Sequence, residues 1–153
     1  MNDSPTNPNR QATPRAGPVL ETALYVAELE RSIEFYGRVL GFLPASEPDS
    51  GMCALNITLG QVLLLFKKGA SAHPTVTSYG VIPPNDGDGN LHAAFFIPGS
   101  DFEFWQDHLR RSAVDVESIV HWPAGGRSIY FRDPDHHCIE LKTSHWNGRE
   151  LDE

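Results

Sequence analysis

A carboxylate stands inside an otherwise apolar run near the end of the chain, at Glu140. The surrounding stretch, Arg127–Lys142, reads RSIYFRDPDHHCIELK, in which two alternating segments flank an Asp-Pro-Asp sequence. Proline presets φ and aspartate side chains bond to the nearby backbone, so this pattern predicts a β-hairpin. A carboxylate among aliphatic strand residues is costly unless it is paired or binds a metal. Glu140 is therefore the first candidate for chemistry.

An internal repeat supplies possible partners for this acid. The segment LETALYV (20–26) aligns with LHAAFFI (91–97), and VLLLF (62–66) aligns with CIELK (138–142). Apolar residues match throughout the first pair except where Glu21 stands opposite His92, an offset of 92 − 21 = 71 residues. In the second pair Glu140 stands opposite Leu64, an offset of 140 − 64 = 76 residues. The repeat predicts an α+β fold of paired βαβββ modules, whose curved mixed sheets surround a shared cavity with helices outside.

In such a fold the first and last strands of the modules would meet in the cavity. Glu21, His92 and Glu140 would then converge, and Leu64 would fill the fourth equivalent place. One imidazole and two carboxylates form a hard, mostly oxygen donor set, which suits Mn²⁺, Fe²⁺, Ni²⁺, Co²⁺ or Zn²⁺ with positions open to substrate. Adjacent substrate oxygens could chelate such an ion, and its positive charge could stabilise an oxyanion.

Other side chains are candidates to line the same cavity. Strand alternation puts Tyr130 on one face together with Ser128 and Arg132, which makes Tyr130 a candidate catalytic residue alongside Glu140. The candidate substrate-lining residues are Trp122, Arg127, Arg132 and Cys138. Packing is an equal alternative for Trp122, and the two cysteines, Cys53 and Cys138, are most simply small hydrophobes.

Each proposed ligand also has a structural alternative. Glu140 could form an ion pair with Arg127 or Arg132, and Glu21 could be a half-exposed residue of an edge strand. His92 stands alone among apolar neighbours and could be a hydrogen-bonded core histidine. In the hairpin turn, His136 and His137 are predicted to be exposed.

The elements that would position these residues follow from periodicity and turn signals. A helix is predicted over 28–40, with Gly41 as its C-terminal stop, and a second helix opens at Ser100 with a capping box to Glu103. Strands are predicted over 19–26, 53–59, 61–66, 91–97, 114–120, and in the hairpin. The expected organisation is a disordered leader (1–18), one domain (19–143) with modules 19–66 and 91–143, and a tail (144–153). The stretch 67–90 is either a linker or a loop over a site.

The amino-acid composition limits which classes of binding partner and which cellular location are expected. A net charge of −8 argues against nucleic acid and anionic membranes, and mildly favours cationic small molecules. No apolar run reaches the roughly 18–20 residues of a membrane span, and the first residues lack the apolar core of a signal peptide. Two cysteines suit a reducing compartment, so a cytoplasmic location is expected.

Three segments in order, ETALYVAELERSIEFYGRVLGF, HAAFFIP and IYFRDPDHHCIEL, resemble the vicinal oxygen chelate superfamily, which includes glyoxalase I, fosfomycin-resistance transferases, extradiol dioxygenases and bleomycin-resistance proteins. The resemblance covers residues 19–143. It implies paired βαβββ units, a homodimer or fused equivalent, and a divalent metal whose ligands fall on Glu21, His92 and Glu140. In the resembling transferases a tyrosine at the place of Tyr130 reaches the substrate.

The chain also departs from this family pattern. Many relatives have histidine where Glu21 stands, glyoxalases have glutamate where Leu64 stands, and His136-His137 replaces the usual Gly-Asn, which could alter the turn. The leading hypothesis is a metal-dependent enzyme that chelates a small oxygen-rich substrate, with lyase, isomerase, transferase and dioxygenase chemistry all open. Leu64 argues against glyoxalase activity. The alternative is a metal-free protein of the bleomycin-resistance type that sequesters a cationic aromatic molecule.

Overall fold

The computed structural model describes residues 13–49, 51–58 and 60–144, so most of the predicted leader (1–18) and tail (144–153) lies outside the described residues. The described part contains two modules of the same plan. The first contains β1 (Glu21–Val26), α1 (Leu29–Leu40), β2 (Leu43–Pro44), β3 (Met52–Thr58) and β4 (Gln61–Lys67). The second contains β7 (His92–Phe96), the 3₁₀ turn η1 (Gly99–Asp101), α2 (Phe102–Arg111), β8 (Val116–His121), β9 (Arg127–Arg132) and β10 (Cys138–Lys142). Each module is thus a βαβββ unit, which confirms the predicted α+β class.

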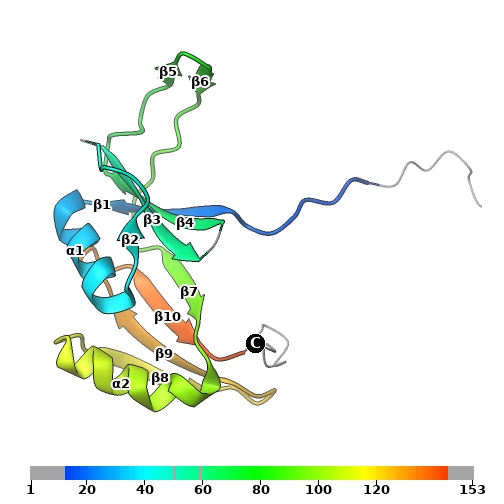
Figure 1. The fold of residues 1–153 in the computed structure, drawn as a ribbon, viewed down its shortest axis with the longest axis vertical. Helices are drawn as coiled ribbons and strands as arrows, with labels where there is room; N and C mark the ends of the chain where they lie inside the picture. Colours follow the sequence, from blue (N-terminus) through cyan, green and yellow to red (C-terminus); the bar gives the residue numbers. More distant parts are fainter. Residues whose placement is uncertain (1–12, 50, 59, 145–153) are drawn as a thin grey trace, which may run out of the picture.

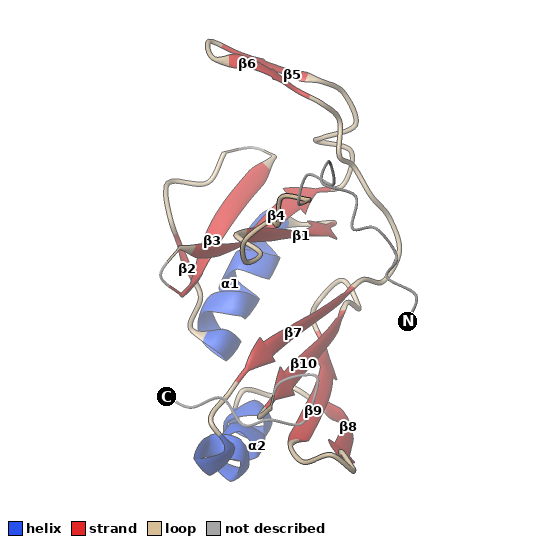
Figure 2. Ribbon diagram, turned by 90° about the vertical axis from the view of Figure 1, so that its right-hand side faces the viewer, coloured by secondary structure: helices blue, strands red, loops and turns tan. Residues whose placement is uncertain are grey.

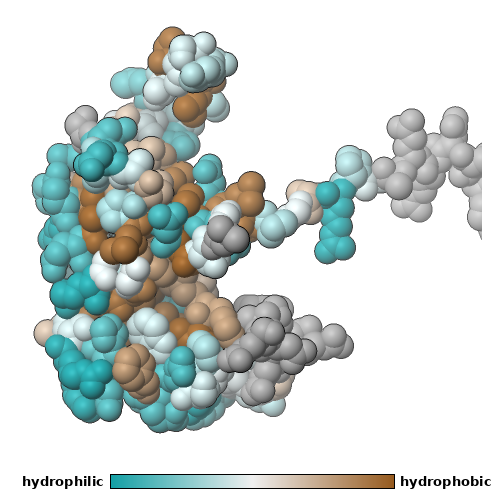
Figure 3. Space-filling model, in the orientation of Figure 1, coloured by the Kyte–Doolittle hydropathy of each residue, from teal (hydrophilic) through white to brown (hydrophobic). Residues whose placement is uncertain are grey.

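The two sheets have the same strand order. The first runs β1-β4-β3-β2 and the second runs β7-β10-β9-β8, with the first and last strands of each module parallel and the other pairs antiparallel. Figures 1 and 2 show one module above the other, with β1 and β7 on the sides that face each other and one helix against each sheet. Figure 3 shows hydrophobic residues gathered between the modules.

The register of the parallel strands confirms the internal repeat. Equivalent partners are Glu21–Val62 with His92–Cys138, and Ala23–Leu64 with Ala94–Glu140. Side chains at paired positions point to the same face of a sheet. The alignment of the two halves therefore corresponds to equivalent places in space within each sheet.

Helix α1 forms for the reasons that its sequence suggests. Its apolar stripe is buried at Leu29, Phe35, Tyr36 and Val39, and it ends where Gly41 takes the left-handed conformation at φ 72°. The predicted capping box of α2 is wrong. The 3₁₀ turn η1 precedes the helix, and the Ser100 hydroxyl donates to the Asp101 carboxylate instead. The N-cap residue, Asp101, makes no side-chain hydrogen bond to the helix in the described part of the chain.

The segment 67–90 carries a hairpin of its own, formed by β5 (Thr75–Thr77) and β6 (Gly80–Ile82). At its base the Asp86 carboxylate accepts hydrogen bonds from the Gly69 N–H and the Ser71 hydroxyl. The hairpin projects away from the two sheets (Figures 1 and 2), and Tyr79 at its tip is 99% exposed. Sequence patterns missed it because its strands have only three residues each.

The turn between β9 and β10 joins the two modules. The buried Asp133 carboxylate accepts a hydrogen bond from the Tyr36 hydroxyl of α1 at 2.8 Å. The Asp135 carboxylate accepts one from the Ala27 N–H, between β1 and α1, at 2.7 Å. A buried carboxylate is stable only when hydrogen bonds replace its water. The Asp-Pro-Asp sequence therefore docks the second module onto the first as well as turning the chain.

His137 belongs to this joint, and its predicted exposure is wrong because the side chain is completely buried. Its Nδ1 accepts a hydrogen bond from the Leu91 N–H at 3.0 Å, so the ring proton lies on Nε2, which donates to the Tyr25 carbonyl at 2.9 Å. His136 is exposed as expected, and its φ of 66° is one that glycine adopts readily. The two histidines therefore keep a hairpin turn in place of Gly-Asn.

Candidate metal and substrate site

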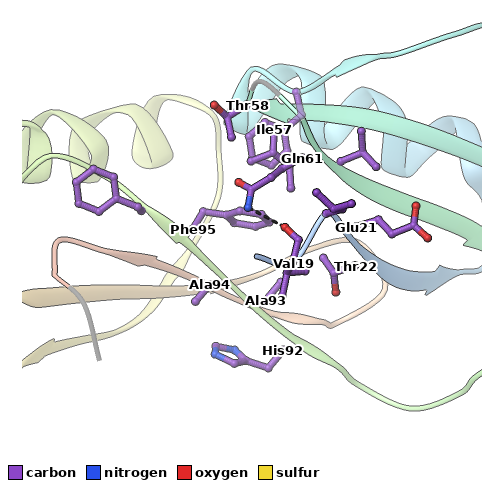
Figure 4. A pocket seen from close by; sticks show the side chains of 14 residues that line it. Val19, Glu21, Thr22, Ile57, Thr58, Gln61, His92, Ala93, Ala94 and Phe95 are labelled. Carbon is purple, nitrogen blue, oxygen red and sulfur yellow. Dashed lines mark hydrogen bonds between the residues drawn. The ribbon is translucent and has the colours of Figure 1, made fainter. Parts of the chain in front are cut away.

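A cavity of about 740 Å³ lies between the modules, lined by residues of β1, β3, β4 and β7. Glu21 and His92 both line it, with Phe42, Ile57 and Phe95 among the apolar residues of its wall. In Figure 4 the Glu21 carboxylate and the His92 imidazole extend in different directions from the strands that carry them.

No helix in the described part of the chain is long and apolar enough to cross a membrane.

His92 and Glu140 form the centre of the site. The two residues lie on adjacent parallel strands, with His92 directly opposite Cys138 and two positions from Glu140, so their side chains share a face. His92 Nε2 lies 3.3 Å from Glu140 Oε2, and Glu140 is only 5% exposed. His92 Nδ1 lies 3.0 Å from the Cys138 carbonyl, to which a protonated Nδ1 donates. In the neutral ring this hydrogen bond leaves the Nε2 lone pair facing the carboxylate.

Two acceptor atoms at this distance repel each other unless a cation lies between them. A proton on Nε2 would satisfy the pair as an ion pair. A metal would also satisfy it, since bonds of about 2.0–2.2 Å to nitrogen and oxygen at tetrahedral or octahedral angles put neighbouring ligands about 3–3.5 Å apart. The 3.3 Å separation therefore fits one edge of a coordination polyhedron.

The other Glu140 oxygen has different partners. Oε1 accepts a hydrogen bond from the Ser128 hydroxyl at 2.5 Å and lies 4.0 Å from Lys142 Nζ. The Ser128 oxygen in turn accepts a hydrogen bond from Trp122 Nε1 at 2.7 Å. Neither Arg127 nor Arg132 pairs with Glu140, because both form ion pairs elsewhere. The suggested ion pair of Glu140 with an arginine is therefore wrong.

Tyr130 shares the face of Glu140. It lies directly opposite Glu140 across the β9–β10 pair, and its ring centroid is 6.4 Å from that of His92. Burial, followed by the hydrogen bond and negative charge of Glu140, raises the pKa of the Tyr130 hydroxyl. The phenol thus stays protonated at neutral pH, and its hydroxyl is a hydrogen-bond donor on the face that carries Glu140.

Glu21 does not join this pair within one chain. It is exposed at the start of β1, and among the described residues no three His, Cys, Asp or Glu side chains are close enough to hold a metal ion. Leu64 occupies the position of the first module that corresponds to Glu140. One chain therefore brings together two of the three predicted ligands.

The proposed lining residues take different places. Arg127 points to the opposite face, where its guanidinium donates to Glu103 at 2.5 Å and lies 3.9 Å from the Phe102 ring centroid, so its predicted lining role is wrong. Arg132 has the parity of Tyr130, but its guanidinium is paired with Glu117 at 2.6 Å. Alternation explains both placements, since odd and even positions of β9 face opposite sides.

Cys138 is half-buried on the face of Glu140, and Trp122 reaches that face through its indole N–H. The sequence interpretation gave no role to Ser128 and Lys142. Both share strand parity with residues of the site, Ser128 with Tyr130 and Lys142 with Glu140. That period of two was the signal that could have identified them.

Comparison with known proteins agrees with this architecture. A family model described as the glyoxalase/bleomycin resistance protein/dioxygenase superfamily matches residues 19–141. A metallothiol transferase FosB of Staphylococcus haemolyticus is 29% identical over 127 residues, which cover 81% of each chain. Another FosB, of Staphylococcus epidermidis, is 31% identical over 121 residues, 77% of this chain and 75% of that protein.

A solved structure has the same fold. The crystal structure of a lactoylglutathione lyase from Agrobacterium tumefaciens superposes with a TM-score of 0.75 at 26% identity, covering 85% of this chain and 95% of that one. Because the family model spans most of the sequence and both modules, the repeat, the fold and the match all describe one domain type. The chain belongs to the glyoxalase/bleomycin resistance protein/dioxygenase superfamily.

Proposed function

We propose that this protein is a metal-dependent enzyme that acts on a small oxygen-rich substrate. The observation that carries the proposal is the His92–Glu140 pair, in which an imidazole nitrogen and a carboxylate oxygen face each other at 3.3 Å on one face of the sheet. Histidine nitrogen and carboxylate oxygen together suit Mn²⁺, Fe²⁺, Ni²⁺, Co²⁺ or Zn²⁺. The similarity to metallothiol transferases over most of the chain supports the same class of chemistry.

The third ligand in this proposal is Glu21 supplied by a second copy of the chain. Glu21 lies outside the His92–Glu140 group within one chain, and among the described strands β1 and β7 are at the edges of their sheets. A homodimer would let the first module of one chain face the second module of the other. A two-fold axis would then relate two identical sites in the dimer. Two-fold symmetry is the commonest symmetry of homo-oligomers.

The residues of the chain have distinct tasks in such a site. His92, Glu140 and Glu21 would hold the metal, which when bound supplies a Lewis acid for two adjacent substrate oxygens. Tyr130 presents a protonated hydroxyl on the same face and would orient the substrate by donating a hydrogen bond. The apolar wall of the cavity would exclude water from part of the substrate. Leu64 leaves no carboxylate at the fourth position for proton transfer.

Metal analysis of protein purified without chelator tests the proposal. We expect close to one divalent metal per chain, with Glu140→Gln losing binding by at least two orders of magnitude because a buried ligand is removed. Glu47→Gln, which changes an exposed carboxylate that neither lines the cavity nor contacts His92 or Glu140, is the matched control and should bind as the wild type does. A wild-type protein that binds no transition metal better than millimolar would reject the enzyme and favour metal-free sequestration of a cationic aromatic compound.

A further inference from the structure

We propose that Trp122 and Ser128 are positioning residues that hold Glu140 so that it binds the metal through Oε2 alone. The inference rests on the proposed metal site and adds the direction in which its buried ligand is presented. Neither residue is one of the proposed ligands. They act through hydrogen bonds in series to the far oxygen of the carboxylate.

The direction of these hydrogen bonds is fixed by chemistry. An indole nitrogen can only donate, so Trp122 Nε1–H must donate to the Ser128 oxygen, at 2.7 Å. A hydroxyl has one hydrogen, and with its oxygen already accepting, that hydrogen is directed to Glu140 Oε1 at 2.5 Å. Ser128 is completely buried, so water does not compete for either bond. The Ser128 hydroxyl thus donates to Glu140 while its oxygen accepts from Trp122.

This arrangement separates the two oxygens of Glu140. Oε1 is occupied by the Ser128 hydroxyl, and the Lys142 ammonium lies 4.0 Å from the same atom. Oε2 instead faces His92 Nε2 at 3.3 Å. Rotation of the carboxylate to present both oxygens to a metal would break a charge-assisted hydrogen bond in a buried place, which is among the stronger hydrogen bonds in proteins.

The turn between β8 and β9 fixes the donor at the start of this series. The Trp122 N–H donates to the Gly126 carbonyl at 3.1 Å, and the Gly125 N–H donates to the Trp122 carbonyl at 3.0 Å. The Lys142 ammonium lies 4.6 Å from the centroid of the Trp122 ring, which adds a cation–π contact. The indole is therefore held from both its backbone and its ring face.

The test compares Ser128→Ala and Trp122→Phe with the wild type. Dissociation constants for Zn²⁺ come from competition with a chelator, and the visible absorption of bound Co²⁺ reports the coordination number. Loss of such a supporting hydrogen bond typically weakens metal binding about 10–100-fold, which we expect for Ser128→Ala. Its freed Oε1 should also coordinate, which lowers the Co²⁺ absorption intensity. Trp122→Phe keeps an aromatic ring but removes the indole N–H, so it should show a smaller change in the same direction.

Ser32→Ala is the matched control because it removes an equally buried hydroxyl in α1, away from the site. It should leave the Zn²⁺ constant and the Co²⁺ spectrum unchanged. If Ser128→Ala and Trp122→Phe bind metal as the wild type does, the positioning role is rejected while the metal site stands. Weaker binding with an unchanged Co²⁺ spectrum rejects ligation through a single oxygen. A wild-type protein without metal affinity rejects the proposed function and this inference together. Should Ser128→Ala fail to fold, Trp122→Phe decides the question by both measurements.

Discussion

At the scale of single residues, buried polar groups are stable here because each has a defined partner. Among the described residues, no buried side-chain nitrogen or oxygen lacks a hydrogen-bond partner. The pair formed by Tyr36 and Asp133 shows how strong the constraint is. The Tyr36 hydroxyl is completely buried and donates to the carboxylate at 2.8 Å. Burial first, and then the charge of Asp133, raises the pKa of Tyr36 far above its ordinary value.

This pair predicts a pH-dependent effect of Tyr36→Phe. At pH 7 the substitution should lower the free energy of unfolding by about 1–3 kcal/mol, because a buried carboxylate oxygen loses its donor. Since the folded pKa is raised, Tyr36 contributes stability below the unfolded pKa of about 10, and this contribution is lost as pH rises further. The difference between variant and wild type should therefore shrink above about pH 10. Urea unfolding at pH 7 and pH 10.5 measures both values, and a constant difference would contradict the assignment.

At the scale of secondary-structure elements, the β9–β10 hairpin has two tasks. Its strands present Tyr130 and Glu140 to the candidate site, and its turn docks onto α1 and β1 through side chains such as His137. One short segment thus fixes both the ligand and the relative position of the modules. Damage to the turn should consequently affect the stability of the whole chain.

Substitution of the two neighbouring histidines tests this role of the turn. His137→Ala leaves the Leu91 N–H and the Tyr25 carbonyl without their partner in a buried place, so we expect a loss of about 2–4 kcal/mol in the free energy of unfolding. His136→Gly changes an exposed residue whose φ glycine accepts freely, and it should stay within about 1 kcal/mol of the wild type. Thermal or urea unfolding gives both values. Equal effects at the two positions would show that the joint adds little.

At the scale of the whole molecule, the modules repeat the same fold but have different chemistry. The second module carries His92 and Glu140 on the face where the first carries Glu21 and Leu64. Because Glu21 lies apart from the pair within the described residues of one chain, our proposal takes it from a second chain. The symmetry of a homodimer would give two such sites per assembly.

A mixed dimer tests whether the site is shared. Glu21→Gln and Glu140→Gln chains, carrying different tags, are expressed together and the heterodimer is isolated. If each site draws Glu21 from one chain and Glu140 from the other, one site of the heterodimer carries both changes and the other is intact. Metal analysis should then give about one tightly bound ion per dimer, whereas each homodimer binds weakly. Weak binding by the heterodimer as well would place all ligands within one chain.

The sequence alone determined the fold and which positions of the two modules are equivalent. Periodicity, the Asp-Pro-Asp turn and the internal repeat predicted two βαβββ units, because hydrophobic spacing and turn chemistry are local properties. Strand alternation put Tyr130 on one face with Ser128 and Arg132, and the strand register adds that Tyr130 lies directly opposite Glu140. The repeat also placed Leu64 opposite Glu140 in the equivalent sheet position.

Only the tertiary structure decided where the ends of long side chains go. Arg127 forms an ion pair with Glu103 instead of lining the site, and buried His137 hydrogen-bonds to the Tyr25 carbonyl of the other module. The sequence could not predict either contact, because the partner residues are far away along the chain. The series from Trp122 through Ser128 to Glu140 likewise spans a turn and two strands. The sequence identified Glu140 as a carboxylate that needs a partner, and the tertiary structure gave each of its two oxygens a different one.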